Sequence, residues 1–356
     1  VAIVVSNVGT WMHDLSAGWL MATLTPSPLL VASVQAATTL PVFLFALPAG
    51  ALADIVDRRR LLLIVKIILT IVAIAMSLSV YLNFMNPWLL LIFTLLMGTG
   101  AAFIAPAWQA IVPQLVPRPE LQQAIALNSV GINISRAIGP AVGGLVIAVV
   151  GLWAPFMLNA ISFIFVIGVL IWWKAGSGEA RALPAERFTG AIRAGLRYTR
   201  ESGPVRNTLY RAIGFFLFAT CYWALLPLIA RDLLKGGPSY YGLLLASIGG
   251  GAVLAALGLP KLKKILGPNK VVATGSAGTA LVLVIFAMSS NQIAGLGASM
   301  LAGASWLAVL SSLNVSTQLA LPEWVRARGL SMLLTVYFGA MAGGSVIWGD
   351  IDGQIG

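Results

Sequence analysis

The sequence predicts an all-α membrane protein with about eleven membrane-spanning helices, on the basis of its hydropathy, its charge distribution and an internal repeat. Hydrophobic residues make up 59% of the 356 positions and charged residues only 9%, and the mean hydropathy is +0.94. Soluble domains are about half apolar and about a quarter charged. Apolar runs of about 20 residues, the length that a helix needs to cross a bilayer, recur along the whole chain. These runs do not alternate polar with apolar residues, as barrel strands would.

The expected spans are separated by connections that alternate in charge. We place the spans at 1–25, 29–52, 61–82, 88–112, 121–150, 153–173, 208–230, 240–259, 270–289, 292–320 and 329–349. Lysine and arginine gather in every second connection, whereas 83–87, 151–153 and 289–291 carry no charge. Positively charged loops stay in the cytoplasm. The N-terminus is therefore predicted to be cytoplasmic, with Arg231, Asp232 and Lys235 as a mild exception on the other side.

The two halves of the chain resemble each other. Residues 114–120 and 318–323 are similar and follow the fourth and tenth spans, and Gly50 and Gly258 precede corresponding basic connections. A repeat of six spans keeps its orientation, so the copies are related by an axis along the membrane normal, with a cavity between them. We expect an N-terminal six-helix bundle at 1–173, a cytoplasmic linker at 174–207 and a C-terminal bundle at 208–356, whose twelfth helix is missing.

Several classes of function find no support in the sequence. A phosphate-binding Gly-x-x-x-x-Gly-Lys-Ser/Thr loop is absent. The single histidine, His13, and the single cysteine, Cys221, leave no metal or nucleophile constellation. We therefore expect no enzymatic activity, no metal and no cofactor. The net charge of +11 is explained by the cytoplasmic loops rather than by nucleic-acid binding.

Two motifs resemble those of the major facilitator superfamily. The connection between the second and third spans is similar to the superfamily's signature loop through Gly50, Asp54, Arg58, Arg59 and Arg60, with Asp57 replacing a glycine. The fifth span resembles the motif of drug/proton antiporters, with Ser135 in place of a glycine, through Arg136, Gly139, Pro140, Gly143 and Gly144. Residues 6–12, 27–30 and 49–60 look like the bacterial secretion-effector branch, which includes an enterobactin exporter and macrolide efflux proteins.

The resemblance implies the major facilitator fold, with two pseudo-symmetric six-helix bundles and twelve helices, about eleven of which are present here. It implies that the charged loop acts as a gate between two states of the transporter. The alternative is that these charges only fix the topology. It also implies that the fifth-span motif seals the cavity against leak and favours antiport, and the alternative is plain helix packing.

Asp14 is the strongest single candidate for a functional residue within a span. Asn7, Trp11, Asp14 and Gly18 follow the spacing of one helical face, and Asp14 lies about 16 Å from the end of the first span. A carboxylate near the midplane of a bilayer is costly and is a functional hypothesis by default. We expect Asp14 to carry the coupled proton, with substrate contact or an ion pair with Arg136 as alternatives. His13 points about 100° away and is expected to pack or form a hydrogen bond, with a second proton carrier as the alternative.

Aromatic and amide residues within the spans suggest an amphiphilic cavity for a bulky ligand. Each could instead serve packing. The candidates for the cavity wall are Asn7, Trp11, Gln35, Trp108, Gln109, Asn128, Asn133, Tyr222, Trp223, Trp306, Asn314 and Tyr337.

The sequence as a whole predicts a monomeric secondary transporter of the bacterial inner membrane. It would export amphiphilic small molecules, such as drugs or siderophore-like metabolites, in exchange for protons. Its partners would be the substrate, protons and the lipid bilayer. An importer or uniporter of the same fold is one alternative, and a non-transporting membrane sensor or lipid-handling protein is another.

Overall fold

The computed structural model describes residues 2–115, 120–173 and 201–355, which form ten α-helices and one short π-helix. The first group of helices is α1 (Ala2–Leu24), α2 (Pro28–Ile55), α3 (Arg58–Tyr81), α4 (Pro87–Leu115), α5 (Leu121–Val149) and α6 (Ala154–Trp172). The second group is α8 (Gly203–Leu228), the π-helix η2 (Ile229–Leu233), α9 (Pro238–Met288), α10 (Gln292–Ala320) and α11 (Glu323–Ile355).

Helix starts follow local rules that the sequence carries. Proline opens α2, α4 and α9, where its missing N–H costs no hydrogen bond. Asp57 caps α3, because its carboxylate accepts a hydrogen bond from the backbone N–H of Arg60 at 2.7 Å. The predicted linker at 174–207 falls largely outside the described residues, and α8 begins at Gly203, ahead of the span expected at 208–230.

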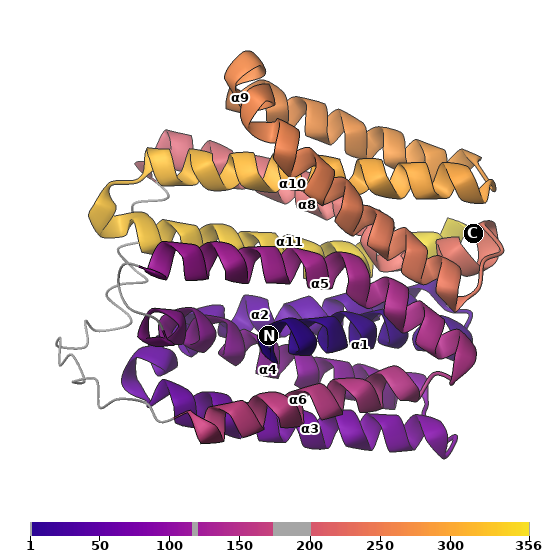
Figure 1. The fold of residues 1–356 in the computed structure, drawn as a ribbon. Coiled ribbons are helices and arrows are strands. Elements are labelled where there is room, and N and C mark those ends of the chain that lie inside the picture. Colours follow the sequence, from indigo (N-terminus) through magenta and orange to yellow (C-terminus); the bar gives the residue numbers. More distant parts are fainter. Residues whose placement is uncertain (1, 116–119, 174–200, 356) are drawn as a thin grey trace.

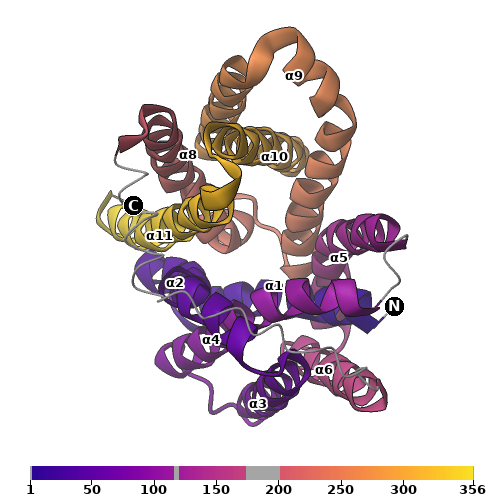
Figure 2. The same ribbon diagram turned by 90° about the vertical axis from the view of Figure 1, so that its left-hand side faces the viewer.

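Helix α9 differs most from the expected pattern. The sequence predicts two spans, at 240–259 and 270–289, joined by a basic loop. In the structure the helix continues through the lysines, and the chain turns at Gly267, whose φ of 76° and ψ of 161° break the helix. Glycine reaches a positive φ without strain, and Pro268 starts the second arm. The two arms therefore form a helical hairpin around α10, and the turn between them lies at the edge of the molecule (Figure 2).

The helices run side by side in two groups, α1–α6 and α8–α11 (Figure 1). Across the boundary between the groups, α2 packs against α11 and α5 packs against α9. Within the first group, α3 packs against α6 and α4, away from this boundary, as the end-on view also shows (Figure 2). Smaller contacts join α2 and α1 to α8, and α1 to α9, so these helices also lie at the boundary.

The outer faces of the helices are apolar. On α3, Ile64, Ile68 and Ile71 are between 52% and 62% exposed and lie on one face. Contiguous apolar surface of this kind is stable in lipid rather than in water. Among the described helices, nine are long and apolar enough to cross a membrane. This count takes the two arms of α9 as one helix and leaves out α1. When the second arm of α9 and α1 are added, the helices correspond to the eleven expected spans. The chain is a multi-pass membrane protein.

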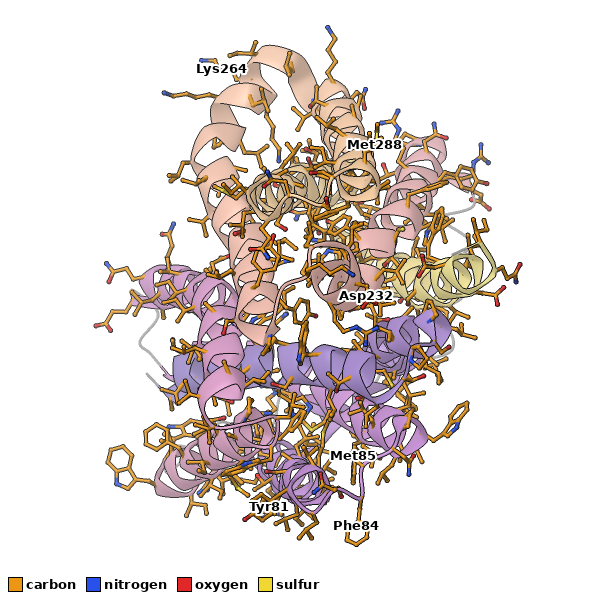
Figure 3. All side chains as sticks on the ribbon, turned by 90° about the vertical axis from the view of Figure 1, so that its right-hand side faces the viewer. Tyr81, Phe84, Met85, Asp232, Lys264 and Met288 are labelled. Carbon is orange, nitrogen blue, oxygen red and sulfur yellow. The ribbon has the colours of Figure 1, made fainter. Side chains whose placement is uncertain are left out.

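The two groups touch most closely near the ends that carry the uncharged connections. A Cβ added to Gly144 on α5 would lie 2.5 Å from the carbonyl oxygen of Pro238, and one on Gly242 of α9 would lie 2.5 Å from the carbonyl oxygen of Pro140. By contrast, Leu127 and Val130, earlier on α5, are 77% and 54% exposed. Figure 3 views this contact end, with Tyr81 and Phe84 at the rim of the first group and Asp232 nearer the centre.

Candidate functional site

A cavity of about 210 Å³ lies between the two helix groups, and we call it the central cavity. Seven helices contribute to its wall, which combines aromatic rings, hydroxyl groups, one amide, one carboxylate and one guanidinium. The residues that set its character are Trp11, Asp14, Gln35, Thr38, Thr39, Arg136, Trp223, Tyr241, Trp306, Tyr337 and Phe338. A wall with this composition fits an amphiphilic ligand that has both flat apolar and polar parts.

Asp14 lies near the middle of α1, and its side chain is exposed although both flanking residues, His13 and Leu15, are buried. The exposure is explained by two cavities, because Asp14 lines both the central cavity and a second one inside the first helix group. Among the described residues, no hydrogen bond or ion pair engages its carboxylate. An unpaired carboxylate in this position is free to exchange a proton or to contact a ligand.

Arg136 reaches the central cavity from α5 and lies between two tryptophans of different helix groups. Its guanidinium carbon is 5.5 Å from the ring centre of Trp11 and 5.7 Å from that of Trp223. These contacts are favourable cation–π arrangements. Its buried Nε has no hydrogen-bond partner, and it forms no ion pair with Asp14 in the part of the chain that the structure describes. The ion pair considered from the sequence is therefore absent from this conformation.

The other residues of the fifth-span motif lie at helix contacts. A Cβ on Gly139 would be 2.6 Å from Cβ of Trp11, and one on Gly143 would be 3.1 Å from Cα of Met12. Both glycines thus bring α5 close to α1, whereas Pro140 and Gly144 bring it close to α9. The packing role is visible in these contacts, and the role in antiport stays a prediction.

The first turn of α3 carries the arginines of the predicted charged loop and holds helix ends together. Arg59 donates hydrogen bonds to the carbonyl oxygens of Leu170 at 2.6 Å and Ile171 at 2.8 Å, the last turn of α6. Carbonyl groups at a helix C-terminus lack helical partners and favour a cation. A Cβ added to Gly50 would have no atom within 4 Å. The side chain of Arg60 is exposed. The side chain of Asp54 lies outside the described residues, so the gating role stays a prediction.

The structure divides the predicted wall residues into three sets. Trp11, Gln35, Trp223, Trp306 and Tyr337 line the central cavity. The second cavity is lined by Asn7, Trp108, Gln109 and Asn128, and by Trp11 again. Neither cavity is lined by Asn133, Asn314 or Tyr222.

These three residues have other surroundings. The amides of Asn133 and Asn314 donate to carbonyl oxygens one turn back in their own helices. Tyr222 is fully buried against its neighbours.

The second cavity, which we call the N-bundle cavity, has a volume of about 380 Å³ and is lined by residues of α1 to α6. Sequence reasoning missed its most informative residue, Lys66 on α3. Lys66 is only 8% exposed, and its Nζ donates to Ser6 Oγ at 3.1 Å and lies 3.9 Å from the centre of the Phe163 ring. A lysine within a predicted membrane span was the signal that could have found it.

His13 also lines this cavity. It is 1% exposed, its ring packs edge-on against Phe156 at 4.9 Å, and neither ring nitrogen has a hydrogen-bond partner. Among the described residues, no group of three or more His, Cys, Asp or Glu side chains could hold a metal ion. Cys221 on α8 is a free, partly buried thiol.

A family model described as "transmembrane secretion effector" matches the chain over residues 1–356. The chain belongs to this family of the major facilitator superfamily. Its members are transporters rather than enzymes, which agrees with the central cavity between two helix groups.

Curated relatives of this secretion-effector chain include siderophore transporters. It is 27% identical over 289 residues to the staphyloferrin A transporter of Staphylococcus aureus, which covers 78% of this chain and 70% of that protein. It is 28% identical over 280 residues to the enterobactin exporter EntS of Escherichia coli, which covers 78% of this chain and 65% of that protein. The chain thus spans about two thirds of the length of these relatives.

Solved structures of several transporters share the fold. A point mutant of the nucleoside transporter NupG has a TM-score of 0.77 at 12% identity, and 99% of this chain and 90% of that chain are covered. A bacterial homolog of the human lysosomal transporter Spinster, in an inward-facing and occupied conformation, has a TM-score of 0.73 at 16% identity, with 99% and 80% covered. The predicted major facilitator fold is therefore confirmed.

Proposed function

We propose that this secretion-effector transporter exports an amphiphilic, siderophore-like small molecule from the bacterial cytoplasm in exchange for protons. The observation that carries the proposal is the position of Asp14, an unpaired carboxylate that opens into the central cavity at the middle of α1. The names of the two siderophore-transporting relatives support the class of substrate.

The central cavity supplies recognition for such a molecule. Aromatic rings of Trp11, Trp223, Trp306 and Tyr337 offer flat apolar surfaces. Arg136, held between two of these rings, offers a cation to anionic oxygen atoms of the ligand. We infer that the ligand occupies the space between the tryptophans and pairs with the guanidinium.

The helix contacts support alternating access. The two groups are joined at the uncharged ends through Gly144 and Gly242, while the opposite end of α5 is exposed. We assign this conformation to the inward-facing state, in which the ligand enters from the cytoplasm. Rocking about the central cavity would then present Asp14 and the ligand to the other side.

The proposal is tested by the accumulation of iron-free enterobactin and staphyloferrin A in bacterial cells that express the full-length protein. The wild type should lower accumulation, and a protonophore should abolish this effect. Cells that express Asp14→Asn should accumulate as much of the compound as cells without the protein. Asp350 is an exposed acid near the end of α11, so cells that express Asp350→Asn should behave as wild type. Higher accumulation in the wild type would instead identify an importer. Equal accumulation of every compound in all strains would contradict the proposal.

A further inference from the structure

The N-bundle cavity is large, and its wall contains a basic group without a paired carboxylate and polar groups without hydrogen-bond partners. Its volume of about 380 Å³ is larger than that of the central cavity. Its wall comes from the first helix group alone, whereas the proposed transport route passes through the central cavity between the groups. The function proposed above assigns it no role.

Lys66 is the cation of this cavity. An ammonium group has three donors and is costly to bury without acceptors. The Ser6 hydroxyl takes one donor and the Phe163 ring lies against the group, so the amine has only two weak partners. In the part of the chain that the structure describes, no carboxylate pairs with Lys66. The group therefore retains capacity for an anion.

Further donor-capable groups lie around the same space. His13 is almost completely buried, and neither of its ring nitrogens has a partner. The buried indole N–H of Trp108 also lacks an acceptor. Buried polar groups in proteins nearly always have a partner, so three incompletely satisfied groups around one cavity point to an occupant that supplies acceptors.

The rest of the wall is apolar. Leu69, Met97, Ile104 and Phe163 provide surface for a hydrocarbon or aromatic body. We propose that the N-bundle cavity is a binding site for a small amphiphilic carboxylate, whose anionic group contacts Lys66 and whose apolar body packs on these residues.

The site adjoins the central cavity through Trp11, Asp14 and Thr38, which line both. An ionised Asp14 on the shared wall opposes a bound anion, because like charges repel across a medium of low dielectric constant. Binding in the N-bundle cavity is thus coupled to the charge at position 14. The inference does not depend on the direction of transport.

The test uses purified full-length protein in phosphatidylcholine nanodiscs, with Cys221→Ala to remove the native thiol and Ala105→Cys to place one in the cavity wall. The reaction rates of the anionic sulfonatoethyl and the cationic trimethylammonioethyl methanethiosulfonates are compared. Lys66→Gln should lower the ratio of the anionic to the cationic rate by about tenfold. Lys66→Arg should keep the ratio of the wild type.

Lys263→Gln is the matched control, because the Nζ of Lys263 also donates to a serine hydroxyl, Ser311 Oγ, at 2.8 Å, but in the second helix group. It should leave the ratio unchanged. Naphthoate should protect the introduced thiol and neutral naphthamide should not. Asp14→Asn should strengthen protection by naphthoate.

Three results would overturn the proposal. The first is an equal ratio in Lys66→Gln and Lys263→Gln, and the second is equal protection by naphthoate and naphthamide. The third is loss of naphthoate protection in nanodiscs that contain phosphatidylglycerol, which would assign the cavity to a lipid headgroup. The comparison of the two naphthalene compounds needs no substitution at Lys66, so it remains decisive if Lys66→Gln does not fold. None of these readouts measures flux, so they separate this site from the proposed export.

Discussion

The interiors of the two helix groups are built from different chemistry. In the first group, Lys66 and His13 are buried, and Asp14 opens into two cavities. Apart from aromatic residues, the buried polar side chains in the described residues of α8–α11 are threonines and serines, and none is charged. There the interior is a cluster of rings, with centres 4.5–6.1 Å apart, formed by Phe215, Phe216, Trp223, Trp306 and Tyr337.

Ionic and packing roles are thus divided between the two halves of one fold. Charges within a membrane are costly and persist for function, whereas aromatic packing stabilises. We infer that the first group carries the ionic steps and that the second provides a rigid apolar surface. Substitutions of the ionic residues in the first group should therefore affect transport more than stability. Substitutions in the ring cluster of the second group should lower stability as well as ligand binding.

The largest loss of stability is expected for Trp306→Ala. Trp306 is 3% exposed and contacts four rings, so its removal leaves a large void in the ring cluster. We expect a loss of about 3 kcal/mol or more. This loss is measured from the thermal unfolding of the purified protein, with size-exclusion chromatography to monitor the folded fraction. The control is Trp172→Ala, at a site on α6 that is 85% exposed. An equal loss of stability in both variants would show that the ring cluster does not stabilise the second group.

Gly251→Ala should follow in size. An added Cβ on Gly251 would collide with the backbone carbonyl of Met300, where α9 packs against α10. We expect about 1–3 kcal/mol of destabilisation from overpacking. The neighbouring Gly250 meets no atom within 4 Å, so Gly250→Ala should unfold at the temperature of the wild type. Equal melting temperatures of the two variants would argue against close packing of α9 on α10.

Arg59→Ala should have a smaller effect. It removes two hydrogen bonds to the end of α6 at a partly exposed site, worth about 1 kcal/mol. The exposed Arg60 provides the control through Arg60→Ala. If both variants unfold at the temperature of the wild type, the α3–α6 contact does not depend on the hydrogen bonds of Arg59.

Lys66→Met should have the smallest effect on stability, near zero or slightly stabilising, because an apolar side chain replaces a buried charge. A pronounced fall in the unfolding temperature would show that Lys66 is a structural residue. It would contradict the division between ionic and packing halves.

Much of the fold could be predicted from the sequence, because apolar length and charge alternation determine spans directly. The α9 hairpin could not, since nothing in its lysines decides between loop and helix, and only the Gly267–Pro268 pair marks the turn. For the site, Trp11, Asp14 and Gly18, which their spacing places on one helical face, line the central cavity.

Neighbouring residues on α8 show the limit. Trp223 faces the central cavity and Tyr222 is buried, because consecutive residues point about 100° apart. Both are aromatic, so composition cannot choose between them. Asn314 satisfies its amide within its own helix, which no count of polar residues reveals.

Proton exchange by Asp14 underlies the proposed export and can be measured directly. Purified protein is reconstituted into liposomes that contain a pH-sensitive dye, and iron-free enterobactin or staphyloferrin A is added. This role of Asp14 predicts that either compound moves protons across the membrane with the wild type and with Asp350→Asn but not with Asp14→Asn. Proton movement that persists in Asp14→Asn would contradict it.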